Sequence, residues 1–173
     1  SNLTALPNYL FLGCSELSEV SIPKNVTVIG DGAFQDCKSI TKIVIPDGVK
    51  SIGYLAFAGC ENLTSITIPA NVEYIGAQAF GASLIETVII EGTPTIQNKA
   101  FRGCANLRTV YLNGNDITFD NTTGQANCWF CNSESNNSNT SNITFYVKNA
   151  NVAEKVKAAM GEEANNTTIY INQ

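Results

Sequence analysis

Cysteines are the residues of this chain that could most readily do chemistry. Two of the six form the close pair Cys128 and Cys131 in the stretch "NCWFC". A C-x-x-C pair can be redox-active, half of a zinc site, a local disulfide or ordinary packing. Redox activity requires a helix N-terminus that lowers a thiol pKa, and the surrounding sequence predicts none. Zinc would need a second ligand pair, but the chain has no histidine and no other C-x-x-C. Packing beside Trp129 and Phe130, or a local disulfide, remains as the interpretation.

The sequence contains few other residues or motifs that could support catalysis. Histidine, the commonest general base, is absent, and the nearest approach to paired carboxylates is Asp116 and Asp120, spaced as in a polar turn. No P-loop, nucleophile elbow, calcium loop or dinucleotide fingerprint occurs. The net charge of −5, with basic residues scattered singly, disfavours nucleic acid, and no apolar run reaches the ~20 residues that span a bilayer. The sequence predicts no enzyme, no cofactor, no metal and no membrane insertion.

The other four cysteines belong to an internal repeat. Phenylalanines recur at 11, 34, 57, 80 and 101, in steps of 23, 23, 23 and 21 residues, and cysteines 14, 37, 60 and 104 each follow three residues later. The unit reads A-F-x-x-C-x-x-L-T-x-I-x-I-P-x-x-V-x-x-I-G-x-x. Three copies are nearly full, one is shortened by deletions, and the fifth decays after Leu112. Self-similarity at such a period is typical of a solenoid.

Each unit predicts one short strand that a proline ends. In "LTSITI" (63–68) the two isoleucines alternate with Thr67, so they point to one face and the threonine to the other. Pro69 has no N–H to give to a ladder and holds the preceding residue extended. We therefore expect it to end this strand, and Pro23 and Pro46 to end the equivalent strands.

The rest of the unit closes the coil. Val72 and Ile75 turn inward on a second straight stretch, and glycines at 30, 53 and 76 follow where a Cβ would be unwelcome. Alanine then lets backbones approach, and phenylalanine fills the middle. One coil cannot bury its own apolar side, whereas stacked coils bury all of them. The fold class is thus a leucine-rich-repeat-type solenoid, short, curved and right-handed, mainly β with irregular turns, with coils roughly 4.8 Å apart.

Both ends of the chain depart from the repeat. The segment 3–14 matches the second half of a coil, so the first coil is truncated. Either upstream repeats were cut away or the mature protein begins here, and we favour the first explanation because an open coil end exposes apolar surface. The polar run 131–142 predicts a loop, "ITFYV" (143–147) a strand, and apolar residues at 152, 156, 159 and 160 one face of a short helix that Gly161 stops. "TTIYI" (167–171) predicts a closing strand. The chain is interpreted as one domain, 1–173, with repeats over 1–119 and a degenerate last coil and cap over 120–173.

The repeat resembles the BspA-type (Treponema-type) leucine-rich repeat, whose unit of about 23 residues carries the signature C-x-x-L-x-x-I-x-I-P-x-x-V-x-x-I-G-x-x-A-F. The resemblance covers residues 3–119. It implies a protein exposed on, or secreted from, a host-associated bacterium. It also implies adhesion and protein binding rather than catalysis.

The repeated cysteines are expected to form a column inside the turn, interrupted at Ser83 or Leu84. Buried free thiols are the favoured interpretation for Cys14, Cys37, Cys60 and Cys104, because cysteine is small enough for a tight interior corner. Disulfides between neighbouring coils or a metal site are the alternatives. A column presents its thiols in a line, which suits tetrahedral zinc poorly.

The outward face of the strands is the candidate partner-binding surface. Its proposed residues are Glu19, Lys42, Val44, Thr67, Ile89 and Tyr111. Tyrosine suits protein contacts, although the β-propensity of valine, isoleucine, tyrosine and threonine would also place them there. A broad surface without convergent polar groups fits a protein or peptide better than a small molecule.

Three functions fit the sequence. The first is a surface-exposed or secreted protein-interaction or adhesion module, acting as a monomer outside the cell on partners such as host extracellular proteins. The second is a structural spacer within a larger surface protein. The third is a solenoid that binds or cleaves polysaccharide, which would need clustered acids or a Lys/Arg pair on adjacent strands. The outward columns supply one glutamate and one lysine.

Overall fold

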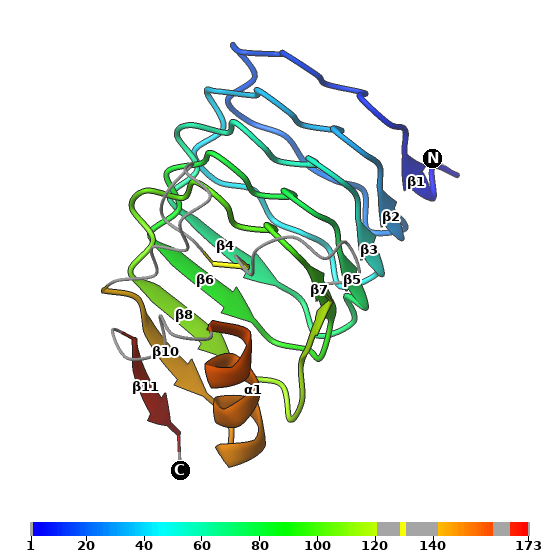
Figure 1. Cartoon of the computed structure of the whole chain (residues 1–173). Helices are drawn as coiled ribbons and strands as arrows, with labels where there is room; N and C mark the ends of the chain where they lie inside the picture. The colour runs from blue at the N-terminus through cyan, green and yellow to red at the C-terminus, as the bar shows by residue number, and fades with distance from the viewer. Residues whose placement is uncertain (1, 121–128, 131–141, 161–166, 173) are drawn as a thin grey trace.

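The chain winds into a stack of coils that carries a parallel sheet on each of two sides (Figure 1). The structure is a computed structural model that describes residues 2–120, 129–130, 142–160 and 167–172. One sheet, here called sheet A, contains β1 (Ala5–Leu6), β2 (Val28–Ile29), β3 (Ser51–Ile52), β5 (Tyr74–Ile75), β7 (Thr95–Gln97) and β9 (Thr118–Asp120), in that order. The other, sheet B, runs β4 (Ser65–Ile68), β6 (Thr87–Ile90), β8 (Thr109–Leu112), β10 (Thr144–Val147) and β11 (Thr168–Ile171).

A column of stacked phenylalanine rings runs through the middle of the coils. Successive ring centroids are 4.9–5.3 Å apart, and the members are Phe11, Phe34, Phe57, Phe80, Phe101 and Phe130. The first five are the repeat phenylalanines, so the prediction that they fill the coil is confirmed. Phe130 continues the stack beyond the regular repeats. Phe145 then meets it edge-on, with centroids 5.5 Å apart and ring planes at 81°.

The strands bury alternate residues, as their period of two requires. In β4, Ile66 and Ile68 are buried and Thr67 is exposed, which confirms the orientation expected from "LTSITI". The two-residue strands of sheet A likewise point one side chain out and the next, such as Ile52 or Ile75, into the core. Adjacent strands pair in parallel, with each residue beside its counterpart in the next coil.

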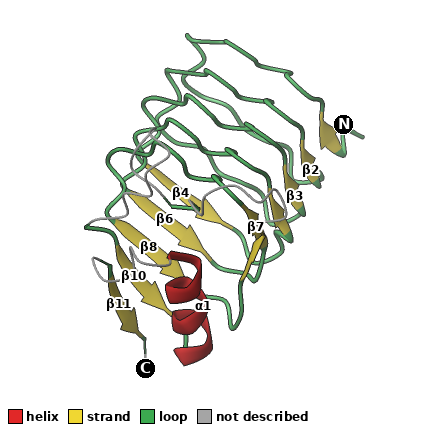
Figure 2. Cartoon of the chain, in the orientation of Figure 1, coloured by secondary structure: helices red, strands yellow, loops and turns green. Residues whose placement is uncertain are grey.

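Sheet B starts later than the repeat predicts. Residues 17–22 and 40–45 match the strand pattern, yet they form no strand, and no backbone hydrogen bond joins residues 40–46 to 17–23 or to 63–69 within the described part of the chain. Figure 2 shows these segments as loops before β4. The expectation of a strand in every coil was therefore wrong for these two segments.

Prolines stand at the positions where the ladder stops, and each removes one of its bonds. After each later strand of sheet B a backbone N–H donates to a carbonyl of the previous coil: Glu91 to Ile68, Asn113 to Ile90, Lys148 to Leu112 and Asn172 to Val147, at 2.9–3.0 Å. The equivalent positions in the second and third coils are Pro46 and Pro69, which have no N–H to donate. The prolines thus remove a ladder bond to the preceding coil, besides ending a strand.

The corner glycines are needed for close approach between coils. A Cβ on Gly76 would lie 2.7 Å from the carbonyl carbon of Gly53, and a Cβ on Gly53 would lie 2.5 Å from the Asp31 carboxylate. Neither glycine has a positive φ. Left-handed backbone occurs instead within the turn, at residues such as Asp36 and Leu55.

The helix and strand expected after the repeats are both present. Helix α1 (Ala150–Met160) buries the face predicted for it, including Val152 and Val156. Its first turn is capped by Asn149, whose side-chain oxygen accepts the Val152 N–H at 3.0 Å. β11 pairs with β10 and so extends sheet B by one strand. Gly161 lies outside the described residues.

We predict that Phe57→Ala will destabilise the protein by about 3–5 kcal/mol, because it leaves a gap between Phe34 and Phe80 in the stack. Urea denaturation would measure the free energy of unfolding. Leu84→Ala removes an exposed apolar side chain from a nearby coil and should change stability by no more than about 0.5 kcal/mol. Equal effects of the two changes would refute a central role for the stack.

An ion pair fastens α1 to the loop before β9, and it predicts a pH dependence. The Lys155 ammonium lies 2.6 Å from Asp116, and its hydrogen bond, together with that of the Ile117 N–H, lowers the pKa of the Asp116 carboxyl. A carboxyl with a lowered folded-state pKa stabilises the fold above its ordinary pKa of about 3.9. This contribution is lost as the pH falls through the folded-state value.

We therefore expect Asp116→Asn to lower Tm at neutral pH, and the difference from the wild type to shrink as the pH falls below the ordinary carboxyl pKa of about 3.9. Thermal denaturation monitored by helical circular dichroism would measure it. Glu154→Gln removes the same charge from the Glu154–Lys157 pair within α1 and should lower Tm less. A deficit for Asp116→Asn that does not change with pH would contradict this role.

Candidate functional site

The outer face of sheet B carries a continuous column of side chains, most of them large. The strand registers place one outward residue of each strand side by side, in the order Thr67, Ile89, Tyr111, Tyr146 and Tyr170. The three tyrosine rings stack, with centroids 4.9 Å apart for Tyr111 and Tyr146 and 5.3 Å for Tyr146 and Tyr170. Two residues earlier on each strand, a second column contains Ser65, Thr87, Thr109, Thr144 and Thr168. We call this two-column surface the tyrosine face.

The structure brings together only part of the predicted face. Thr67, Ile89 and Tyr111 lie next to one another on hydrogen-bonded strands of sheet B. Lys42 and Val44 are exposed on the coil before β4, where no ladder forms, and Glu19 is one coil further away. The six residues therefore belong to two surfaces, a paired sheet and an adjoining unpaired region.

Two members of the column, Tyr146 and Tyr170, were missed from the sequence. Their strands lie beyond the regular repeats, where the 23-residue spacing no longer aligns them. A usable signal was present, because β8, β10 and β11 read "TVYL", "TFYV" and "TIYI". The shared pattern T-x-Y-x would have placed all three tyrosines on one face.

The chemistry of the tyrosine face is that of a contact surface. Both of its columns consist of hydroxyl-bearing and aliphatic side chains without formal charge. Among the residues that the structure describes, no group of three or more His, Cys, Asp or Glu side chains is placed to hold a metal. Within those same residues, no helix is long and apolar enough to cross a membrane.

The repeated cysteines are free thiols, and three of the four are buried. The Sγ of Cys37, Cys60 and Cys104 donates to the carbonyl of the phenylalanine in the preceding coil, at 3.1–3.3 Å. Burial raises the pKa of the thiols to about 11 for Cys37, about 12 for Cys60 and about 11 for Cys104. Ser83 occupies the gap in the column, with its Oγ 3.6 Å from the Cys104 Sγ.

Cys14 is exposed, so the prediction that it is buried was wrong. Each buried thiol lies against the phenylalanine carbonyl of the coil before it, and in this chain Cys14 belongs to the first coil. Sequence position within the unit is therefore insufficient to predict burial, because burial also requires a neighbouring coil. Cys128 and Cys131 lie outside the described residues.

The two sheets, the ring stack and the open outer face define a leucine-rich-repeat solenoid with an exposed sheet surface. The model of the BspA type Leucine rich repeat region matches residues 4–133, and the chain belongs to this family. A search of curated proteins finds no match.

A solved structure agrees with this fold. The pneumococcal vaccine antigen PcpA superposes with a TM-score of 0.70 at 18% identity, over 99% of this chain and 42% of that one. A leucine-rich repeat protein from Bacteroides ovatus ATCC 8483 gives 0.49 at 21% identity, over 87% of this chain and 54% of that one. This chain thus spans about half the length of these proteins or less. At such identities the likeness to PcpA shows the fold alone.

We predict that an alkylating reagent will modify Cys14 in the native protein, while Cys37, Cys60 and Cys104 react only after denaturation. The thiolate is the reactive form, and burial both raises the thiol pKa and blocks access. Mass spectrometry of digested peptides would locate the label. In Cys14→Ser the native protein should take up no label at the remaining repeat positions. Labelling of Cys60 as fast as Cys14 would refute the buried column.

Proposed function

We propose that this chain is a non-catalytic module of a surface-exposed or secreted protein, and that its tyrosine face binds a protein partner in adhesion to host or neighbouring cells. The observation that carries the proposal is the stack of three tyrosines on the outside of a hydrogen-bonded sheet. Stacked rings on paired strands form a surface ordered before binding, which lowers the entropy lost when a partner docks. The BspA-type family supports the location outside the cell.

The shape of the column favours protein over polysaccharide. A sugar ring binds aromatic side chains by lying flat on a free ring face, but Tyr146 is covered by Tyr111 on one face and by Tyr170 on the other. The side chains therefore present ring edges and hydroxyl groups to a partner. Such a flat, neutral, partly apolar strip resembles the centre of a protein interface, where tyrosine is enriched and charge is depleted.

A purely structural spacer is the competing interpretation. A spacer requires the phenylalanine stack and the hydrogen-bonded sheets, but the identity of the outward-facing residues does not matter for its function. Exposed apolar side chains on a sheet face also carry a risk of aggregation, which polar residues would avoid. The presence of Ile89 and three tyrosines in one column is better explained by a contact surface.

We expect the double change Ile89→Ser and Tyr111→Ala to weaken binding to an immobilised partner protein by about 2 kcal/mol, roughly thirtyfold. The partner would come from a panel of host extracellular proteins probed with the wild-type chain, with a glycan array in parallel. Because Tyr111 stacks on Tyr146, the free energy of unfolding should also fall by about 0.5–1.5 kcal/mol.

Tyr54→Ala is the matched control, because Tyr54 is an exposed tyrosine in a turn away from sheet B. It should leave binding unchanged. Unaltered affinity of the folded double variant would show that the tyrosine face is not the site. Binding to glycans alone would favour the polysaccharide hypothesis, and binding to neither array would favour the spacer.

A further inference from the structure

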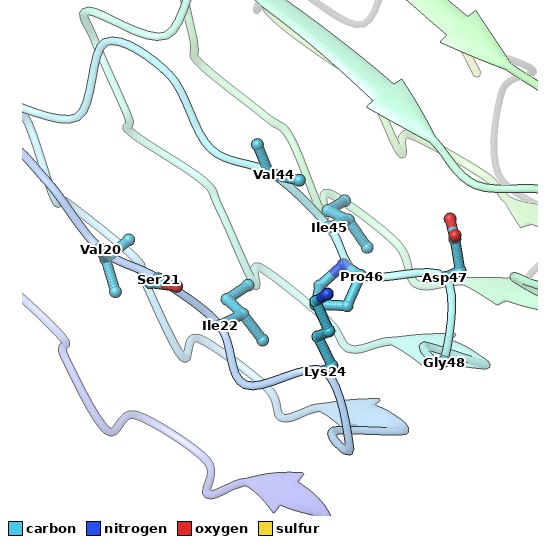
Figure 3. Close-up of a pocket in the computed structure, with 9 residues that line it drawn as sticks. All are labelled: Val20, Ser21, Ile22, Lys24, Val44, Ile45, Pro46, Asp47 and Gly48. Carbon is cyan, nitrogen blue, oxygen red and sulfur yellow. The ribbon is translucent and has the colours of Figure 1, made fainter.

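A groove separates the first two coils on the side where they form no ladder. It has a volume of about 460 Å³ and lies between residues 20–24 on one wall and 44–48 on the other. Figure 3 shows the walls running side by side, with Val20 and Ile22 on one and Val44 and Ile45 on the other. We call it the proline groove, because Pro46 lines it.

The walls of the groove carry unused backbone hydrogen-bonding groups. Alternate residues of an extended segment share one edge. In the later coils the residue at the proline position donates its N–H to the preceding coil, as Glu91 does to Ile68. Pro46 occupies the position of Glu91 in its own coil. The amide of Val44, two residues before Pro46, therefore faces the first coil. It makes no backbone hydrogen bond within the described residues, and the facing segment 20–22 makes none to it.

The groove is a fixed feature of the fold. Its walls are anchored by Ile22 and Ile45, which are 6% and 3% exposed. The same two coils are held together on their other side by the pairing of β2 with β3 and by the stacked Phe11 and Phe34 rings. Residues 42–45 are therefore held in place with backbone amides that make no ladder, and strand addition requires such a fixed, unpaired edge.

The charges at the groove select among occupants. Lys24 on one wall and Asp47 on the other stand at the same end of the groove (Figure 3). Neither takes part in an ion pair within the part of the chain that the structure describes. A strongly charged ligand would gain from one and lose to the other. A segment without net charge is complementary to this pair.

From these observations we infer that the proline groove binds an uncharged, extended peptide segment of a partner protein, which adds as a strand to the open edge of residues 42–45. Main-chain hydrogen bonds would supply affinity, and an aliphatic side chain of the peptide would lie against Val20 and Val44. The site is separate from the tyrosine face, and neither requires the other.

Titration of the ¹⁵N-labelled protein with a neutral strand peptide would test the inference. A suitable probe is the acetylated and amidated peptide TVYLNGN, the sequence of residues 109–115, whose first four residues form the parallel strand β8 in this fold. We expect shifts of the Val44 amide and its neighbours in 20–24 and 42–48, and slower hydrogen exchange at 42–45. The same peptide N-methylated at alternate residues keeps the side chains but loses donors, and should bind about tenfold more weakly.

A pair of variants separates backbone pairing from side-chain contact. Val44 is 67% exposed, so Val44→Pro removes its unpartnered N–H with little loss of packing, and Val44→Thr keeps the N–H. Peptide binding should fall about tenfold in the proline variant and stay within about twofold in the threonine variant.

Several results would overturn the inference. Equal binding of the methylated and unmethylated peptides would do so, as would shifts confined to residues outside the groove. Concentration-dependent shifts of the same amides without peptide would identify a second copy of the chain as the occupant instead. The Ile89→Ser and Tyr111→Ala variant should bind the peptide normally, so failure at the groove and failure at the tyrosine face are distinguishable.

Discussion

The contact of each coil with the coil before it is the interaction on which the rest of this structure depends. A single coil exposes its phenylalanine, its cysteine and its inward isoleucines, and all of them become buried only when another coil covers them. The ring spacing of 4.9–5.3 Å along the stack is close to the spacing of paired strands. Ring stacking and strand pairing therefore favour nearly the same distance between neighbouring coils, so both can be satisfied at once.

The same dependence explains what could be predicted from the sequence and what could not. Properties set within one unit were predictable: the inward isoleucines of β4, the phenylalanine at the centre, and the close approach at Gly53 and Gly76. Properties set between units were not. Cys14 fits the unit as well as Cys37 does, but only Cys37 has a phenylalanine carbonyl of a preceding coil above its thiol.

The candidate surfaces were predictable only in part, for a related reason. Reading outward positions from a fixed period found Thr67, Ile89 and Tyr111, because their coils keep the register. Tyr146 and Tyr170 follow segments that break the period, and the structure restores their register through strand pairing. Pairing is thus the better guide to a surface, since it aligns strands whatever the length of the chain between them.

One position of the unit differs between the coils of sheet B that pair with the coil before them and those that do not. Where it is Glu91, Asn113 or Lys148, the backbone N–H completes a ladder, and the outward side chains form a rigid sheet. Where it is Pro46 or Pro69, that bond cannot form, and the edge that faces the preceding coil stays unpaired, even though β4 before Pro69 pairs with β6 of the following coil. The coils that contain Pro46 and Pro69 still stack on each other through sheet A and the phenylalanine rings, and this stacking buries the core. The core does not require the ladder of sheet B, so this side of the coil can differ from one repeat to the next. A solenoid with one repeating architecture can therefore carry a flat contact face and an unpaired strand edge next to each other.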